Sequence, residues 1–416
     1  MQLGQVLIVA RLLGPEGAGV FAIALLLPTM LSQLFNLGLN SANVYLIASR
    51  QFLLEEAWTA SRDAMAVMGL VGLSVGVVVI LNWGETLFPG IAQTVLLSAM
   101  LIYPTSLIAG VVAGLFQSLQ DFRAFNLTVL VQPTLALLGI TVLWIFNDVD
   151  LVTVIHIVVV SHALALSVAL LLLSRKTPLA ASGASRMTYL RVALVYGLKA
   201  HLANLLSFLN YRLDLFLVNL IAGPASAGLY TVAVRLAEQL WMISQAVSTV
   251  IFPRLSAMLD DKISRDYFTA MTARCVLWIT LAAATVLSLT ASPLIVLLFG
   301  ADFQDAAFAL LLLIPGIVLY SCARVLANSF AASGRVGINL WLSIAVLIVN
   351  TVANLALIPK FGIAGAAAAT TLAYCLTLVV YLVLQQVINK QHWHNFILPT
   401  KVDLMRLRQF VKKGKT

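Results

Sequence analysis

The sequence predicts an all-α polytopic membrane protein with about 12 transmembrane helices, in two parallel six-helix lobes with a central cavity. Three observations predict this fold class. The composition is 61% hydrophobic and only 10% charged, with a mean hydropathy of +1.01, far above the values of soluble domains. Most of the chain consists of apolar runs long enough to cross a bilayer. A short Gly-Pro phrase also recurs half-way along the chain.

The apolar runs are the predicted membrane segments, at 2–13, 18–48, 64–81, 91–117, 125–146, 150–173, 192–221, 226–253, 272–299, 304–331, 336–358 and 362–388. Most exceed the roughly 20 residues that a helix needs to cross about 30 Å of hydrocarbon. The first run would reach only about 18 Å as a helix. We therefore expect a truncated first helix, and favour a translation start upstream of Met1 over a genuine stub.

The repeated phrase lies between apolar runs in both halves. Residues 13–21 read LGPEGAGVF, and residues 222–230, 209 positions later, read AGPASAGLY. Gly tolerates left-handed backbone and Pro cannot continue the preceding helix, so each copy predicts a tight reversal. A hairpin duplicated at half-length indicates two fused copies of one bundle. With six helices in each, the second copy enters from the same side as the first, so the repeats are expected to be parallel.

Charge and composition divide the chain further. We expect an N-terminal lobe at 1–174, a polar, basic cytoplasmic linker at 175–190, a C-terminal lobe at 191–390 and a basic cytoplasmic tail at 391–416. Alternate connections hold 19 of the 25 Lys and Arg residues, whereas the intervening connections hold two. Cytoplasmic loops gather basic residues, so both termini are predicted to be cytoplasmic. The net charge of +9 is then a topology signal, and no nucleic-acid partner is expected.

Ionisable residues inside apolar helices carry a high energetic cost and mark candidate functional positions. They gather in the second half, and the candidate binding residues are Lys199, Arg212, Asp214, Arg235, Glu238 and Arg324. Four cations against two carboxylates favour an anionic guest such as a pyrophosphate, because guanidinium groups match phosphate oxygens. The alternative is a set of neutralised ion pairs that hold two helices together. Counting from the turn at 222–226 predicts the pairs Asp214–Arg235 and Arg212–Glu238, and either carboxylate could carry a coupling proton.

Uncharged polar residues in the same helices have two open interpretations. They could bind sugar hydroxyls or simply hold helices together, and they are Asn204, Asn210, Tyr211, Asn219 and Gln239. The three cysteines are scattered without metal or disulfide spacing. We therefore expect no metal, and we expect no cofactor. No segment resembles a nucleotide-binding loop, so the expected energy source is an ion gradient or the flux of downstream reactions.

Four motifs together resemble a known family. They are ARLLGPEGAGVF at 10–21, NYRLD at 210–214, IFPRL at 251–255 and LIPKFGIAGAA at 357–367. In order and spacing they are similar to polysaccharide biosynthesis membrane proteins, the O-antigen and exopolysaccharide flippases of the multidrug/oligosaccharidyl-lipid/polysaccharide (MOP) exporter superfamily. Arg212 and Asp214 match a charged position of that family, whereas Arg235, Glu238, Arg324 and Lys199 rest on the charge argument alone.

The resemblance implies a function as well as a fold. Members of the family flip undecaprenyl-pyrophosphate-linked oligosaccharide across the bacterial cytoplasmic (inner) membrane by alternating access, for O-antigen, lipopolysaccharide, capsule or exopolysaccharide assembly. The implied partners are the lipid-linked oligosaccharide, membrane lipids and a polysaccharide polymerase complex.

Three alternatives remain open. A multidrug cation antiporter of the superfamily would favour an acidic cavity, and a lipid II flippase would have two further helices. A membrane polysaccharide polymerase would need a catalytic loop, whereas the outer connections here are short. A transporter is therefore expected, and an enzyme is not.

Overall fold

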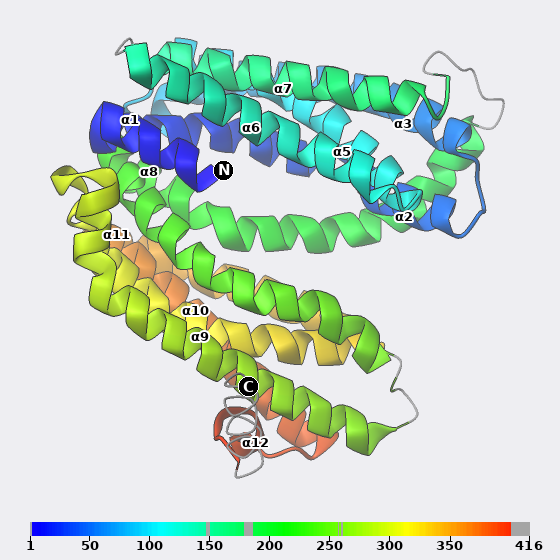
Figure 1. Ribbon diagram of the computed structural model, residues 1–416, viewed down its shortest axis with the longest axis vertical. Helices are drawn as coiled ribbons and strands as arrows, with labels where there is room; N and C mark the ends of the chain where they lie inside the picture. The colour runs from blue at the N-terminus through cyan, green and yellow to red at the C-terminus, as the bar shows by residue number, and fades with distance from the viewer. Residues whose placement is uncertain (1, 147–149, 179–185, 257, 259–260, 401–416) are drawn as a thin grey trace, which may run out of the picture. The chain divides into compact units, whose positions relative to one another are not determined.

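The computed structural model describes residues 2–146, 150–178, 186–256, 258 and 261–400, without the side chains of residues 2, 199, 200, 252, 253, 256 and 336 (Figure 1). Parts of the predicted linker and tail, 179–185 and 401–416, therefore lie outside the described residues. The described chain is helical and contains no strand. The predicted all-α membrane fold class is confirmed by this architecture and by the structural likenesses given below.

The helices, in chain order, are α1 (Gln2–Phe35), α2 (Leu39–Ala48), α3 (Leu54–Leu87), α4 (Gln93–Met100), α5 (Ile102–Ser118), α6 (Phe122–Phe146), α7 (Leu151–Ser174), α8 (Arg186–Ser256), α9 (Lys262–Phe299), α10 (Ala306–Ala332), α11 (Val336–Asn389) and α12 (His394–Ile397). A short 3-10 turn, Ala301–Phe303, precedes α10. Within the described residues, nine helices are long and apolar enough to span a membrane.

Three of these long helices are each broken once, at a glycine. The breaks lie at Gly14 in α1 (φ 66°, ψ −171°), Gly223 in α8 (φ 80°, ψ 177°) and Gly362 in α11 (φ 55°, ψ −133°). Backbone of this kind is open essentially to glycine alone. Each break separates two of the predicted segments, so the twelve predicted apolar segments are present. Gly14 and Gly223 adopt nearly the same conformation, which supports the duplication.

Other boundaries differ from the sequence prediction. The predicted run 18–48 is interrupted after Phe35, where Leu37 (φ 53°) and Gly38 (φ 70°) turn the chain before α2. The side chain of Asn36 stabilises this turn, because its Oδ1 accepts a hydrogen bond of 2.8 Å from the Gly38 amide. α3 begins ten residues before the predicted run at 64–81, because Glu56 caps it by accepting 2.9 Å from the Leu53 amide.

The chain forms two compact units. Unit 1 comprises Met1–Thr231 with Leu298–Asp302, and unit 2 comprises Val232–Leu297 with Phe303–Thr416. The predicted lobes at 1–174 and 191–390 describe the sequence repeat rather than compactness, and they stay a prediction.

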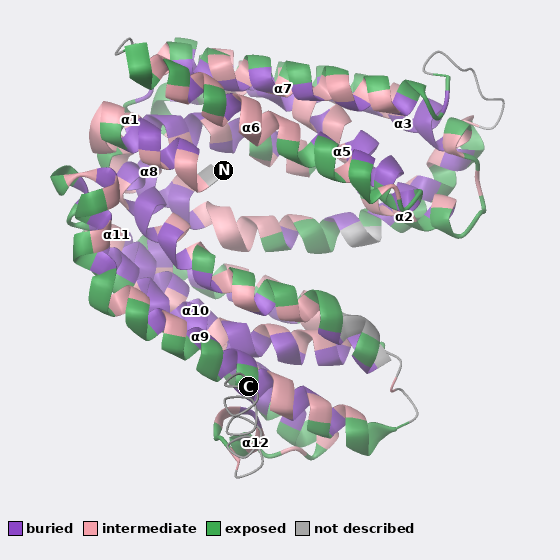
Figure 2. Ribbon diagram, viewed as in Figure 1, coloured by how far each residue is buried: buried purple, intermediate pink, exposed green. Residues whose placement is uncertain are grey.

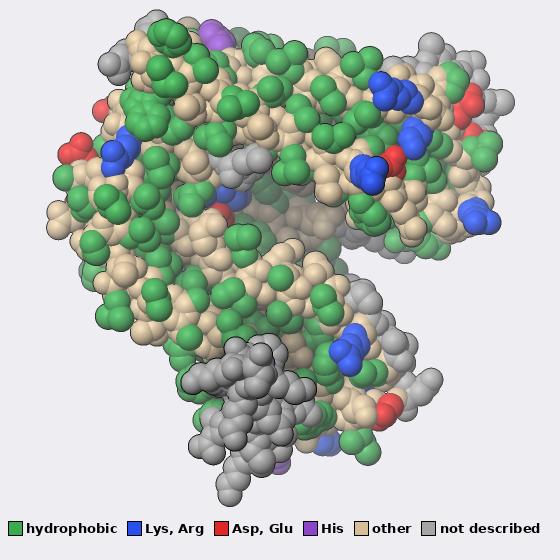
Figure 3. All heavy atoms as spheres, in the orientation of Figure 1, with side chains coloured by type: hydrophobic (Ala, Val, Ile, Leu, Met, Phe, Trp, Pro, Cys, Tyr) green, Lys and Arg blue, Asp and Glu red, His purple; other side chains and the backbone are tan. Residues whose placement is uncertain are grey.

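Both units have buried interiors and apolar outer surfaces. In unit 1 the fully buried Tyr103 of α5 donates 2.6 Å to the Met68 carbonyl of α3. In unit 2 α10 is largely buried and packs against α11, where Thr371 donates 2.6 Å to the Leu312 carbonyl (Figure 2). Hydrophobic side chains cover much of the visible exterior (Figure 3). Exposed apolar surface on this scale fits contact with lipid.

Candidate functional site

The two copies of the Gly-Pro phrase lie against each other inside unit 1. A Cβ atom added at Gly19 would collide with the carbonyl oxygen of Pro224, and one added at Gly228 would collide with that of Pro15. Each added Cβ would also lie 2.9 Å from the backbone nitrogen of the other glycine. Glycine therefore lets the two helix backbones approach closely, as small residues do at membrane helix interfaces. The reciprocity of the contact is what a duplicated hairpin predicts.

The second copy of the Gly-Pro phrase contains Tyr230, which is a hydrogen-bond partner of the candidate residue Asp214. Asp214 is buried, with 5% of its surface exposed, and its Oδ2 accepts a 2.7 Å hydrogen bond from the hydroxyl of Tyr230. Its Oδ1 accepts 2.7 Å from the amide of Leu215. Tyr230 is itself fully buried and occupies the position that Phe21 has in the first copy. Sequence reasoning missed this contact, although both residues lie at similar distances from the break at Gly223.

In unit 2 the candidates Arg235 and Glu238 form an ion pair within α8. Nη1 of Arg235 lies 3.2 Å from Oε2 of Glu238, one helical turn away, and the side chains are 25% and 16% exposed. This pairing follows from the i, i+3 spacing. The sequence-based expectation considered only partners on neighbouring helices.

Arg324 of α10 lies in an aromatic setting in unit 2. Its Nη1 donates 2.5 Å to Oε1 of Gln245, and its guanidinium lies 5.5 Å from the ring centres of both Trp241 and Tyr320. Tyr320 in turn stacks on Tyr374 at 4.5 Å. Cation–π contacts and a neutral amide hold a guanidinium in place within an apolar helix.

The other predicted features are Lys199, the two cross-helix pairs and the uncharged polar residues. Lys199 belongs to α8, but its side chain lies outside the described residues. The cross-helix pairs Asp214–Arg235 and Arg212–Glu238 stay predictions. Asn210 and Gln239 each donate to a carbonyl of their own helix, at 3.0 and 2.9 Å, which is a structural role.

A polar cavity in unit 1 was not expected from the sequence. It has a volume of about 370 Å³ and lies where the end of α1 and the start of α2 meet α5 and α8. Its lining residues are Ser32, Gln33, Asn36, Gly38, Asn40, Ser41, Ser106, Leu107, Gly110, Val111, Asn204 and Phe208. Only Asn204 was singled out in advance. The amide-rich stretch NLGLNSAN at 36–43 was the available signal, hidden inside an apolar run.

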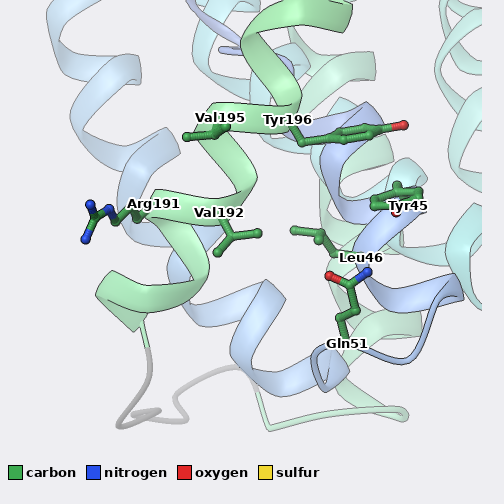
Figure 4. Close-up of a pocket in the computed structure, with 7 residues that line it drawn as sticks. All are labelled: Tyr45, Leu46, Gln51, Arg191, Val192, Val195 and Tyr196. Carbon is green, nitrogen blue, oxygen red and sulfur yellow. The ribbon is translucent and has the colours of Figure 1, made fainter.

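A second cavity of about 360 Å³ in unit 1 is lined almost wholly by apolar groups (Figure 4). Tyr45 of α2 and Tyr196 of α8 stack there, with ring centres 4.4 Å apart and an interplanar angle of 5°. The side chain of Arg191 points away from this aromatic pair. Gln51 and Arg191 are the lining residues with strongly polar side chains, and the exposed lining is otherwise apolar.

Known sequences resemble this chain over much of its length. Residues 8–308 match the sequence profile of the polysaccharide biosynthesis protein family. A relative from Haloferax volcanii, named as a probable low-salt glycan biosynthesis flippase, Agl15, is 23% identical over 172 residues. That match covers 41% of this chain and 36% of the relative, so the chain spans about a third of the relative's length.

Several solved structures share this fold, among them a lipid II flippase and a multidrug transporter. The lipid II flippase MurJ in an inward closed conformation aligns with a TM-score of 0.77 at 16% identity, over 93% of this chain and 85% of that protein. An inward-facing multidrug resistance MATE family transporter of the MOP superfamily aligns with a TM-score of 0.72 at 15% identity, over 92% and 93%. At these identities the likeness establishes the fold.

Proposed function

The chain belongs to the polysaccharide biosynthesis protein family, and we propose that it flips undecaprenyl-pyrophosphate-linked oligosaccharide from the inner to the outer leaflet of the bacterial cytoplasmic membrane. The product would serve O-antigen, capsule or exopolysaccharide assembly, by hand-over to a polysaccharide polymerase complex. Both chain termini would face the cytoplasm, as the distribution of Lys and Arg predicts.

The observation that carries the proposal is the set of arginines in apolar helices. Arg212, Arg235 and Arg324 are all half-buried, in segments where a charge is expensive. With Asp214 and Glu238 as the matching carboxylates, the described candidates hold one more cation than anion. A pyrophosphate headgroup has the complementary charge, and the planar guanidinium donates to two phosphate oxygens at once. A multidrug cation would be repelled by this surplus of positive charge.

Alternating access is the proposed mechanism because the chain carries a duplicated bundle. The matching backbone at Gly14 and Gly223 and the reciprocal contact of Gly19 with Gly228 support this part of the proposal. The headgroup and glycan would cross in contact with polar side chains while the prenyl chain stays in lipid. Asp214 or Glu238 would be the candidate carrier of a coupling proton.

Charge reversal tests the headgroup role. In the source bacterium with the gene deleted, we expect loss of surface glycan and accumulation of its lipid-linked precursor in the membrane. The wild-type chain should restore export, whereas Arg212→Glu and Arg235→Glu should not, because each would present a carboxylate to the pyrophosphate. Surface glycan is measured by gel and immunoblot, and the amount of inserted protein by a fluorescent fusion.

Lys262→Glu is the matched control, because Lys262 is exposed at the start of α9 and the same charge change there should leave export intact. Full export by both arginine variants would remove the headgroup role. Normal surface glycan in the deletion strain would contradict the proposed function altogether. If the chain instead rescued a strain that lacks its lipid II flippase and did not restore glycan export, its function would be that of a lipid II flippase.

A further inference from the structure

We propose that the polar cavity of unit 1 is a binding subsite for an uncharged sugar ring of the lipid-linked glycan. This inference rests on the proposed function and assigns a different part of the substrate to a different part of the chain. The arginines would hold the pyrophosphate, and the neutral cavity would hold glycan. Its volume of about 370 Å³ falls within the range of roughly 300–1,000 Å³ typical of small-ligand sites.

The cavity is created by the break between α1 and α2. Gly38 at this break lies so close to α8 that an added Cβ would collide with the carbonyl group of Gly197. This approach of the two backbones fixes the position of α8 relative to the turn. Asn204 follows Gly197 by seven residues, two helical turns along the same face, and lines the cavity. Phe208 lines it one turn further on.

Hydrogen-bonding groups on the lining are available to a ligand. Among the residues that the structure describes, the exposed side chains of Asn40 and Asn204 find no hydrogen-bond partner. Each carboxamide offers two donors and two acceptor lone pairs, which suits sugar hydroxyls because these both donate and accept. The Oδ1 atom of Asn40 occupies the space that a side chain at Gly114 would fill.

Other lining groups are held in place by the protein. The hydroxyls of Ser32 and Ser106 are 2.7 Å apart and join α1 to α5, and Ser106 also donates 2.9 Å to the carbonyl of Tyr103. The half-buried ring of Phe208 supplies an apolar face of the kind that packs against the C–H face of a sugar. A lining fixed by such hydrogen bonds, with the amides of Asn40 and Asn204 available to a ligand, is a preorganised site.

The charge of the lining separates this cavity from the headgroup site. None of the described residues that line it is Lys, Arg, Asp or Glu. A pyrophosphate would find no counter-charge there, and an acyl chain would leave the amides without partners. A neutral sugar ring, which is rich in hydroxyls, can form hydrogen bonds with the amides of the lining.

Gly110 of α5 allows the cavity to be filled without disturbing the fold. It lines the cavity, and a Cβ atom at this position would meet no atom within 4 Å. Gly110→Leu should therefore occupy ligand space while leaving the helix packing intact. Gly337→Leu is the matched control, because Gly337 lies exposed at the start of α11 and also has open space around it. Asn204→Leu, which replaces the amide oxygen and nitrogen by methyl groups and keeps the number of side-chain heavy atoms, is an independent second variant.

The experiment measures binding of four defined lipids to the full-length protein in nanodiscs. The probes are undecaprenyl pyrophosphate and its derivatives carrying glucose, galactose or N-acetylglucosamine. We expect wild-type protein to bind at least one sugar-bearing lipid about tenfold more tightly than the sugar-free lipid, the change that about 1.4 kcal/mol produces. Gly110→Leu and Asn204→Leu should abolish this preference and leave the affinity for undecaprenyl pyrophosphate unchanged. Gly337→Leu should behave as wild type.

The possible results separate the two proposals. If wild-type protein binds all four lipids equally, or if Gly110→Leu retains the preference for sugar, the cavity is not a glycan subsite, while the headgroup role stands. If wild-type protein binds none of the four lipids, the proposed function fails and the glycan subsite fails with it. Loss of binding to all four lipids in Gly110→Leu, with Gly337→Leu unaffected, would show that the cavity serves the whole substrate and would overturn the division of roles.

Discussion

Gly228→Ala tests whether close approach of the two Gly-Pro phrases stabilises the fold. The new methyl group would overlap the carbonyl oxygen of Pro15 and lie 2.9 Å from the nitrogen of Gly19. Both atoms belong to backbone, so no side-chain rotation can relieve the overlap. The two helices would have to separate or bend.

Two opposing effects determine how far Gly228→Ala changes the free energy of unfolding. Replacing a helical glycine by alanine stabilises a helix by about 0.5–1 kcal/mol when the new methyl group meets no obstacle. Overpacking a tight contact destabilises by about 1–3 kcal/mol, and a backbone obstacle places the change in the upper part of this range. We therefore expect Gly228→Ala to lower the free energy of unfolding by about 1–2 kcal/mol. Gly337→Ala, in open space, should raise it slightly.

The assay is reversible unfolding of the purified protein in mixed micelles with increasing mole fraction of SDS, followed by tryptophan fluorescence. Gly19→Ala should have a similar effect, because its added methyl group meets the carbonyl oxygen of Pro224 in the reciprocal contact. The double variant should lose less than the sum of the two single changes, with a coupling of about 1 kcal/mol, since helices already forced apart accommodate the second methyl group.

A stability of Gly228→Ala equal to or above that of Gly337→Ala would refute the reasoning. Strict additivity in the double variant would show that the two glycines do not share one contact, even if each single variant were destabilised.

Two further predictions concern individual hydrogen bonds. Tyr230→Phe removes the 2.7 Å hydrogen bond to Asp214 and should lower the free energy of unfolding by about 1.5–3 kcal/mol, as expected for a bond to a carboxylate; the same change at the exposed Tyr267 should have no measurable effect. Asp121, in the connection between α5 and α6, accepts a 2.9 Å hydrogen bond from Lys176, which follows α7, and this bond lowers the pKa of the Asp121 carboxyl group below its ordinary value. The stability from this pair is therefore present above about pH 4 and lost as the pH falls through the lowered pKa. Asp121→Asn should weaken the acid dependence of the unfolding midpoint between pH 7 and pH 3, and an unchanged slope would exclude a contribution from this pair.

Local signals in the sequence were strong enough to predict the helical architecture. Long apolar runs and the Gly-Pro phrase each act through neighbours in the chain, so the breaks at Gly14 and Gly223 could be placed to within a few residues. The break at Asn36–Gly38 escaped prediction because one of its residues with positive φ is Leu37, a side chain that rarely adopts such backbone. Hydropathy alone does not detect such a turn.

For the candidate site, too, the sequence identified residues but did not predict most of their contacts. Charged residues inside apolar helices stand out in any sequence, so Arg212, Asp214, Arg235, Glu238 and Arg324 could be named in advance. Their contacts depended on geometry. The contacts of Arg324 with Trp241 and Gln245 join α10 to α8, residues far apart in the chain, whereas Arg235–Glu238 and Arg324–Tyr320 lie within one helix.

By itself the sequence determined that this chain is a duplicated, helical membrane protein with cationic groups among its apolar helices, because hydrophobicity, glycine backbone freedom and the cost of burying charge are properties of single residues and short segments. Only the tertiary structure decided that Tyr230 binds Asp214, that Gly19 and Gly228 share one contact, and that amides from α2 and α8 line one cavity. Those outcomes depend on which helix faces meet, and that is fixed by packing between residues distant in the chain.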